Sequence, residues 1–370
     1  MPVNLALGHV STDFMIAALM IYSLAVLAFA GDFAFGRPRR GAEAGKAAEA
    51  GKAQVRARAD ALATVGAPAQ GAAGAAAPGA AGAAPPGAAG AGPGGDSSVP
   101  DSMPPIALSP LRAIMAAGSW VRAGMALSSA GVLAHALAVI TRGLAVHRAP
   151  WGNMYEFVTA LTCFAAIFFL WAMIRYRAWS LGVFVFGAVV VILGLAETLI
   201  YTAAGNLVPA LQSYWLSIHV TAMTVATGVF FVAAVLGVIY LVVDHYNRRV
   251  AAGKSQPGNG IIARLPSLEQ LDRLAYRTVV FGFPVWTFGV MAGAIWADEA
   301  WGRYWGWDPV ETWAFITWVV YAAFLHSRAT AGWRGRRAHY VQLLGFATLA
   351  FNILVVQVFI TGLHSYAGVS

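Results

Sequence analysis

Long apolar runs recur along the chain and set its pattern of hydrophobic and polar positions. A helix needs roughly 20 apolar residues to cross about 30 Å of hydrocarbon, and continuous runs of this length fit helices better than barrel strands. The pattern therefore predicts an all-α integral membrane protein, a polytopic bundle of about eight transmembrane helices. The expected spans are 14–34, 120–141, 157–174, 182–201, 216–243, 277–297, 310–327 and 341–363.

One segment interrupts the apolar pattern. Residues 36–107 are dominated by Ala, Gly and Pro and have too few large apolar side chains to build a core, which predicts a disordered cytoplasmic tether. The tether separates an N-terminal transmembrane anchor, 1–35, from a membrane domain, 108–370. Because the first span has no basic segment before it and three arginines in the four residues from 37 to 40, we expect a retained anchor and not a cleaved signal peptide.

Composition and charge narrow the class of protein. The chain has 370 residues, 59% of them hydrophobic and 11% charged, and its mean hydropathy of +0.66 is too high for an ordinary soluble domain. Loops rich in Lys and Arg stay cytoplasmic, and with the tether inside only Arg142, Arg148 and Arg303 of the 24 basic residues fall outside. Both termini are then expected outside the plasma (inner) membrane. The net charge of +8 reflects this topology, because the positive charge lies in membrane-flanking loops, and a nucleic-acid partner is an inferior explanation. Membrane lipid is the expected surrounding partner.

Cysteine and histidine usage limits the possible metal chemistry. The single cysteine, Cys163, lies in an apolar run, so the chain forms no internal disulfide and has no Cys-x-x-Cys-His motif for covalent haem. The protein is therefore not itself a c-type cytochrome. Its eight histidines are the candidate metal ligands, because imidazole suits iron and no thiolate cluster competes.

A tryptophan-rich loop between the sixth and seventh spans, 301–313, is the strongest local signal. Indole rings offer broad apolar faces, so the loop predicts a platform for a large flat ligand, and its two glycines would let the backbone approach that ligand. The alternative is an interfacial belt of aromatic side chains at headgroup level. The candidate ligand-binding residues of the loop are Trp301, Tyr304, Trp305, Trp307, Asp308 and Trp313.

The acidic residues of this loop have two interpretations. Asp308 and Glu311 could be a catalytic carboxylate pair. The favoured interpretation is structural, because Asp at the N-cap, Pro309 at the first helical position and Glu at the third form a capping box for the seventh span. A fixed helix start would then hold the aromatic platform rigid.

Two histidines converge on the tryptophan loop by topology. His219 lies at the outer start of the fifth span and His364 at the outer end of the eighth, so both reach the outer face. Two imidazoles can supply both axial ligands of one haem iron. We therefore predict His219 and His364 as ligands of haem on the outer face.

The remaining histidines carry weaker predictions. His326 lies 17 residues after Pro309, about 26 Å along a helix, and is either a ligand of a second haem on the inner side or a solvated residue at the membrane edge. His135 and His147 are secondary candidates for iron ligands. His147 shares a short outer loop with Trp151, and Trp151 and Tyr155 could extend the aromatic surface. We expect His9, His245 and His339 to be solvated surface residues and leave Glu197 without a role.

Four stretches of the sequence resemble the CcsA (ResC) family of System II cytochrome c biogenesis, haem-handling proteins that carry a WWD domain. The resemblance covers about residue 120 to the end of the chain. Val310 stands where the family commonly has Lys, and Asp298 where it commonly has Asn. The stretches are WADEAWGRYWGWDPVETW from Trp296, the Leu-His-Ser-Arg segment ending at Arg328, Gly-Leu-His-Ser-Tyr-Ala ending at Ala367, and Tyr-Trp-Leu-Ser-Ile-His-Val ending at Val220.

The resemblance implies a function and a set of partners. It implies that His219 and His364 ligate an external haem b, and that His326 ligates a haem received from inside, with the other ligand supplied by the partner CcsB (ResB). The chain would then transport haem and present it, as a subunit of a cytochrome c synthase (haem lyase) complex, for thioether attachment to the Cys-x-x-Cys-His motif of apocytochrome c. A thiol-reducing protein is a candidate further partner.

Three rival functions remain open at this point. A haem-handling subunit of System I would share the tryptophan motif but work with a haem chaperone. A general haem exporter would supply haem outside the membrane without any synthase role. A purely structural assembly factor would leave the converging histidines unexplained.

Overall fold

The computed structural model describes residues 3–36, 110–205, 213–256 and 260–364, and these fold into helices without a strand. Seven helical segments in this part of the chain are long and apolar enough to cross a membrane, which confirms the predicted all-α polytopic membrane protein. They are formed by α1 (Leu5–Phe35), α4 (Ser119–Val146), α5 (Met154–Tyr176), α6 (Gly182–Leu199), α7 (Tyr214–Ala251), α8 (Leu268–Trp301), and α10 (Arg336–Phe351) continued into α11 (Gln357–Phe359).

An eighth long helix, α9 (Pro309–Ala329), takes the place of the span predicted at 310–327. It is not among the seven segments, because polar residues in its first and last turns, Glu311, His326 and Arg328, shorten its apolar run. It packs against α10 and α8. A short helix, α3 (Pro110–Met115), precedes α4. Apart from Gly36, the tether predicted at 36–107 lies outside the described residues.

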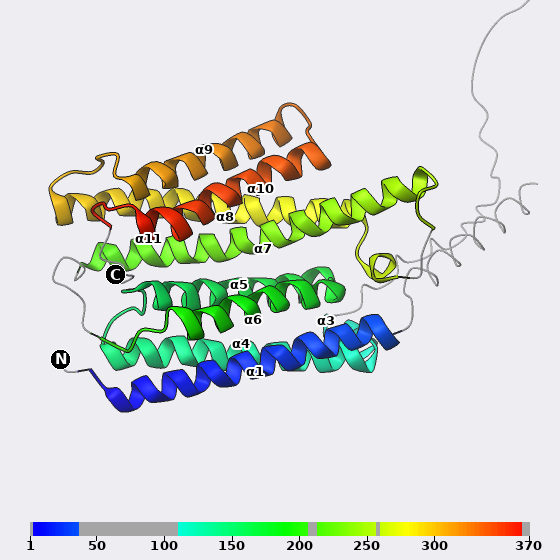
Figure 1. The fold of residues 1–370 in the computed structure, drawn as a ribbon, viewed down its shortest axis with the longest axis horizontal. Helices are drawn as coiled ribbons and strands as arrows, with labels where there is room; N and C mark the ends of the chain where they lie inside the picture. Colours follow the sequence, from blue (N-terminus) through cyan, green and yellow to red (C-terminus); the bar gives the residue numbers. More distant parts are fainter. Residues whose placement is uncertain (1–2, 37–109, 206–212, 257–259, 365–370) are drawn as a thin grey trace, which may run out of the picture. The chain divides into compact units, whose positions relative to one another are not determined.

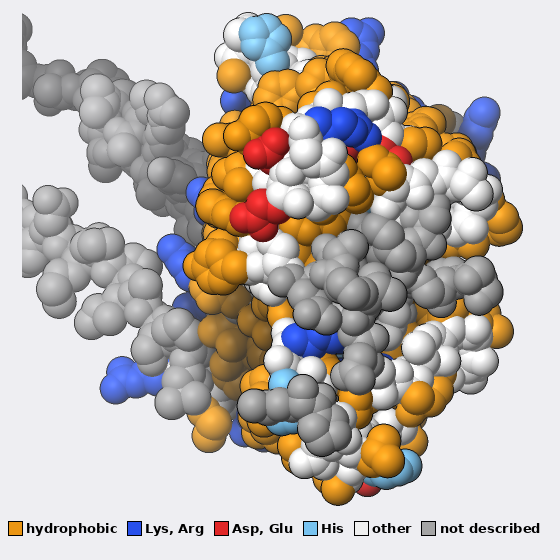
Figure 2. Space-filling view, turned by 90° about the vertical axis from the view of Figure 1, so that its left-hand side faces the viewer, with side chains coloured by type: hydrophobic (Ala, Val, Ile, Leu, Met, Phe, Trp, Pro, Cys, Tyr) orange, Lys and Arg blue, Asp and Glu red, His pale blue; other side chains and the backbone are white. Residues whose placement is uncertain are grey.

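The long helices run back and forth along one common axis within the unit that contains 1–38 and 110–370 (Figure 1). One end of this bundle therefore gathers the segments that the charge pattern assigns to the outer face: the N-terminus of α1, the α4–α5 and α8–α9 loops, the start of α7, and His364. Figure 2 looks onto this end, where hydrophobic side chains alternate with other polar side chains and backbone, and a few acidic, basic and histidine side chains lie between them.

Two clusters of buried hydrophobic side chains form the core. The first joins α1, α4, α5 and α6 and extends to α7 and the start of α8. Glycines of α4 let aromatic rings of α1 approach closely: a Cβ on Gly131 would lie 2.6 Å from Tyr22, and one on Gly124 would lie 2.6 Å from Phe29. Such small residues let membrane helices pack without a hydrophobic driving force between them. The second cluster joins α7, α8, α9 and α10 around Trp286 and Tyr321.

Candidate functional site

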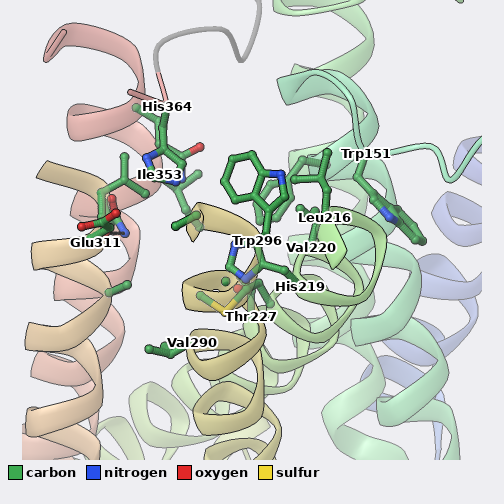
Figure 3. Close-up of a pocket in the computed structure, with 18 of the residues that line it drawn as sticks. Trp151, Leu216, His219, Val220, Thr227, Val290, Trp296, Glu311, Ile353 and His364 are labelled. Carbon is green, nitrogen blue, oxygen red and sulfur yellow. Dashed lines mark hydrogen bonds between the residues drawn. The ribbon is translucent and has the colours of Figure 1, made fainter. Parts of the chain in front are cut away.

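A cavity lies in the second half of the bundle, at the end that carries the α8–α9 loop (Figure 3). The empty space within it is about 1190 Å³, its open mouth included. Most of its lining comes from α7, α8, α9, the α8–α9 loop and the segment from the end of α10 to His364, and the α4–α5 loop with the start of α5 completes it. Five residues predicted as ligand-binding lie in the lining, namely His219, His364, Trp301, Tyr304 and Trp305. The structure therefore brings the two outer histidines and part of the tryptophan loop to one cavity.

His219 projects from the first turns of α7 against α8. Its Nδ1 lies 2.8 Å from the carbonyl oxygen of Gly289. Because a carbonyl oxygen only accepts hydrogen bonds, Nδ1 carries the hydrogen and the neutral ring has its lone pair on Nε2. Gly293 makes room for the ring, since a Cβ at this position would lie 2.6 Å from it. The glycines of α8 thus fix both the place and the tautomer of this imidazole.

Trp296 is the central aromatic residue of the cavity. Its indole lies nearly parallel to the His219 ring, at 6.1 Å between centroids and 9° between planes. The same indole meets the rings of Trp301 and His364 edge-on, at 4.8 and 5.9 Å. The two rings are parallel without close face-to-face contact, and a metal ion would approach the edge of the His219 ring at Nε2. Figure 3 shows Trp296 between the side that carries His364 and the side that carries Trp151.

His364 is held by Asp308 across the cavity mouth. Its Nδ1 lies 2.8 Å from Asp308 Oδ1, while Asp308 Oδ2 accepts a hydrogen bond from the backbone N–H of Leu363 at 2.7 Å. Burial raises the pKa of the Asp308 carboxyl, but the hydrogen bonds from His364, Leu363 and Val310 outweigh burial and lower the pKa below its ordinary value. A carboxylate that accepts from one ring nitrogen fixes a histidine in the way that outer-shell partners orient metal-binding imidazoles.

The start of α9 confirms the predicted capping box. Asp308 accepts from Val310 N at 3.1 Å, and Glu311 Oε2 accepts from the backbone N–H of Asp308 at 3.1 Å. The same Oε2 accepts from Gly306 N at 2.9 Å, which ties the tryptophan loop to the first turn of α9. Asp308 therefore caps α9 and holds His364 at the same time.

Two of the predicted loop aromatic residues, Trp307 and Trp313, are absent from the cavity lining, and a third, Tyr304, is largely exposed. Trp307 is 64% exposed, is absent from the lining, and packs edge-on against Trp305 and Phe315. Trp313 is also absent from the lining and packs on Phe351 at 4.3 Å. Tyr304 reaches the lining although most of its side chain is exposed. The loop thus divides into an inward part at Trp301 and Trp305 and an outward part that resembles an interfacial belt.

Comparison with known proteins identifies the family. The family model described as "Cytochrome C assembly protein" matches residues 151–364, which run from the α4–α5 loop to His364 and include all five predicted residues of the cavity lining. The chain belongs to the cytochrome c assembly protein family. Two relatives named "Cytochrome c biogenesis protein CcsA" support this assignment. The one from Guillardia theta is 38% identical over 237 residues, 59% of this chain and 76% of the relative. The one from Synechococcus sp. (strain CC9605) is 36% identical over 244 residues, which cover 59% of this chain and 77% of the relative.

A solved structure is also similar to this family member. It is the "Cytochrome c Heme Lyase CcmF", which is 20% identical with a TM-score of 0.46. The similarity covers 66% of this chain and 43% of that one, so the assembly-family chain spans less than half the length of CcmF.

The other predicted iron ligands of this assembly-family protein lie away from the cavity. His326 is exposed near the opposite end of α9. His135 is fully buried between α1 and α5, where Nε2 lies 3.0 Å from the carbonyl oxygen of Thr159 and Nδ1 lies 3.5 Å from the hydroxyl of Tyr22. His147 ends α4 in the left-handed region and is exposed. In this structure His135 is a paired core residue, and neither His147 nor His326 lines the cavity.

The prediction that His339 is a solvated surface residue is wrong. It is 1% exposed, stacks on Tyr240 at 3.9 Å between centroids, and lies 2.8 Å from Gln342 Oε1 through Nδ1 and 3.2 Å from Asp272 through Nε2. Arg328 pairs with the same carboxylate through two hydrogen bonds. Basic residues surround His339 in the sequence and suggested a solvated position. The buried network of Asp272, Arg328 and His339 forms only when α8, α9 and α10 pack together.

Two acidic residues at the outer end of the first core, Glu197 and Glu156, have polar partners that account for their positions. Glu197, which had no assigned role, accepts a hydrogen bond of 2.7 Å from the Tyr155 hydroxyl. Tyr155 therefore does not extend the aromatic surface of the cavity, whereas Trp151 does line it. Glu156 accepts from Arg142 at 3.0 Å and from Arg148 at 2.8 Å, with its own side chain fully buried. This ion cluster fixes the α4–α5 loop that forms one wall of the cavity.

Sequence reasoning gave no role to two lining residues, Trp296 and Asn352. A signal for Trp296 was present, because Trp286, Gly289, Gly293 and Trp296 have the spacing of one helix face. Asn352 carried no comparable signal. It begins a π-helical stretch, Asn352–Val356, and this local change of helix type brings its side chain to the cavity.

Proposed function

We propose that this chain is the haem transport and presentation subunit of a System II cytochrome c synthase. One observation carries the proposal: His219 and His364 line one cavity, and each directs Nδ1 to a fixed acceptor. In a neutral imidazole held this way the lone pair lies on Nε2, which is a common arrangement of metal-binding histidine. Haem iron takes imidazole ligands of this kind.

The lining of the cavity fits a haem as substrate. Haem is a broad apolar disc, and Trp296, Trp301 and Trp305 offer aromatic faces and edges against which such a disc can pack. Hydrophobic walls with a few fixed polar groups are typical of sites for ligands of this kind. On this proposal His219 and His364 bind the iron of haem b on the outer face, and Asp308 orients His364.

The proposed reaction joins haem to apocytochrome c. The CcsA names of the relatives support a role in cytochrome c biogenesis. The chain would hold haem so that its vinyl groups meet the thiols of a Cys-x-x-Cys-His motif, and positioning of the reactants would provide much of the rate enhancement. His326, near the opposite end of α9, would bind haem on the inner side together with a ligand from the partner CcsB. The cavity end and both termini would face outward, as the distribution of basic residues suggests.

The test uses the full chain purified with co-expressed CcsB. Haem content, absorption spectra and covalent transfer to a Cys-x-x-Cys-His peptide are measured for the wild type and for His219→Ala, His364→Ala and His326→Ala. We expect each variant to lose bound haem or change its ligation. His147→Ala is the matched control, because His147 is exposed and does not line the cavity. Normal haem content, spectra and transfer in all three variants would overturn the proposal.

The rival functions give different results in the same preparation and in cells. A general exporter predicts that cells without the protein lose haem outside the membrane broadly, whereas the proposed synthase subunit predicts selective loss of haem bound covalently to c-type cytochromes. A System I subunit would co-purify with a haem chaperone in place of CcsB.

A further inference from the structure

One carboxylate oxygen in the wall of the cavity has no hydrogen-bond donor among the described residues. Glu311 is 8% exposed and lines the cavity on the side that Figure 3 shows with Ile353 and His364. Its Oε2 accepts both backbone hydrogen bonds of the loop, from Gly306 and Asp308. Its Oε1 is buried and accepts none. A buried acceptor left without a donor is costly, so its presence needs an explanation.

A second unpartnered acceptor belongs to the same wall. Asn352 is 4% exposed and lines the cavity from the start of the π-helical stretch. Its Nδ2 donates to the carbonyl oxygen of Val310 at 3.3 Å, and this bond fixes the orientation of the amide because a carbonyl oxygen cannot donate. Its Oδ1 is buried and accepts no hydrogen bond from the described residues. Short π-helical insertions of this kind occur frequently at functional sites.

Two hydrogen-bond acceptors in one wall favour a ligand group that donates a hydrogen bond. A haem propionate is itself an anionic acceptor, and like charge would repel it from Glu311. A cysteine thiol carries a hydrogen that a carboxylate can accept, and the proposed reaction brings thiols to this cavity. The thiolate and not the thiol is the nucleophile, so the reaction gains from a base beside the thiol.

We propose that Glu311 is the proton acceptor for the cysteine thiol during thioether formation, with Asn352 Oδ1 as a second acceptor that orients the thiol. This inference rests on the proposed function. The thiol S–H bond breaks and its proton passes to Glu311 Oε1, while sulfur bonds to the vinyl carbon next to the porphyrin ring. The terminal vinyl carbon takes the proton from Glu311 as the carbon–sulfur bond forms, so that no negative charge remains on the vinyl group. The carboxylate is regenerated, and the addition needs no oxidant or reductant.

The local structure keeps this carboxylate in place. Two backbone N–H groups hold Oε2, so the group loses little freedom when Oε1 accepts a proton. The side chain that precedes it, Val310, is apolar and also lines the cavity, and it introduces no cation beside the carboxylate. General base groups placed in this way typically accelerate a reaction by about 10²–10⁴-fold.

The test compares Glu311→Gln with the wild type in the full chain co-purified with CcsB. Glutamine also serves in a capping box, so its oxygen can accept the bonds from Gly306 and Asp308 while its amide replaces Oε1. Haem content and absorption spectrum are measured first, followed by the rate of covalent transfer to a Cys-x-x-Cys-His peptide. The control is Glu299→Gln, which removes an exposed carboxylate bound to Ser213 outside the cavity lining. A second substrate carries selenocysteine in place of cysteine, because a selenol ionises more readily and needs no base.

We expect Glu311→Gln to keep normal haem content and spectrum and to slow transfer to the cysteine peptide at least about hundredfold. The ratio of wild-type to variant rates should fall close to one for the selenocysteine peptide, which a loss of structure alone would not cause. A normal rate with the cysteine peptide, or an equal defect with both peptides, would overturn this role of Glu311 and leave the haem-binding function standing. Absence of covalent transfer by the wild-type complex, in contrast, would overturn the proposed function itself.

Discussion

His135 and Glu156 in the first half of the bundle differ from His219, Glu311 and Asn352 in the second half in how completely their polar atoms are paired. In the first half, α1 and α4 to α6, both ring nitrogens of His135 have partners, and each carboxylate oxygen of Glu156 meets an arginine. In the second half, α7 to α11, His219 uses Nδ1 for a backbone carbonyl, and Glu311 and Asn352 each have a buried oxygen without a donor among the described residues.

This difference distinguishes residues that stabilise the packing of the helices from residues that form the candidate ligand site. A fully paired buried charge stabilises the arrangement of helices that carries it, and removing one partner leaves the other uncompensated. A side chain of the cavity lining that is fixed through one polar atom and keeps another without a partner is oriented for a ligand. The same residue types therefore have different roles in the two halves, and the comparison can be tested by substitutions in each.

The largest effect is expected for Glu156→Ala in the first half. The substitution leaves Arg142 buried and Arg148 half-buried without their carboxylate, and breaking a buried pair typically costs about 3–5 kcal/mol in the free energy of unfolding. Thermal unfolding of the purified protein in detergent measures this effect. Glu269→Ala breaks an exposed pair with Arg273 and should cost only about 0.3–0.5 kcal/mol. Equal losses in the two variants would remove the distinction between the buried and the exposed pair.

Asp308→Ala should have the next largest effect, mainly on haem. It removes the acceptor that orients His364, and loss of such an outer-shell partner typically costs about 10–100-fold in metal affinity. It also removes the N-cap of α9, which costs about 1 kcal/mol of stability. Asp308→Asn keeps a good N-cap, so its stability should stay near that of wild type while haem affinity, measured by titration, still falls. Normal haem affinity in both variants would show that Asp308 acts only as a cap.

Gly293→Ala should weaken haem binding about tenfold, with the effect again confined to the second half. A Cβ at this position would lie 2.6 Å from the His219 ring and would displace it from the Gly289 carbonyl. The control is Gly187→Ala in α6, where no heavy atom lies within 4 Å and the change should be neutral or stabilise the helix by about 0.5–1 kcal/mol. Haem titration and thermal unfolding check both variants. Unchanged haem affinity in Gly293→Ala would mean that the position of this imidazole does not matter for binding.

The smallest effect is expected within the tryptophan loop itself. Trp307→Phe changes an exposed side chain outside the cavity and should keep haem content within about twofold of wild type, because an interfacial position tolerates another aromatic ring. Trp301→Phe should lower haem content more, since Trp301 contacts the rings of Trp296 and His364. A larger loss in Trp307→Phe than in Trp301→Phe would reverse the division of the loop into inward and outward parts.

The fold could be predicted well from the sequence because long apolar runs identify membrane helices. The capping box at Asp308 was also readable, since it depends on residues three positions apart. The convergence of His219 and His364 followed from topology alone. Successive spans run in opposite directions, so the start of the fifth and the end of the eighth lie at the same end of the bundle. These features depend on local pattern or on the order of the spans.

Features that depend on which helix faces meet could not be predicted. The burial of His339 requires Asp272 from α8 and Tyr240 from α7. The split of the tryptophan loop depends on backbone geometry, in which Trp307 takes a positive φ of 57° and turns out of the cavity. The role of Gly289 and Gly293 became visible only when α7 packed against α8. In each case the deciding contact joins residues that the sequence does not place together.

The most direct test of this account is the spin state of the iron in the haem-loaded complex with CcsB. His326→Ala is used as the common background, so that spectra report the outer haem alone. Absorption and electron paramagnetic resonance spectra should show low-spin, six-coordinate iron in that background. Adding either His219→Ala or His364→Ala should convert it to high-spin iron with one protein ligand. Low-spin iron that persists in both double variants would contradict the claim that these two histidines bind one haem.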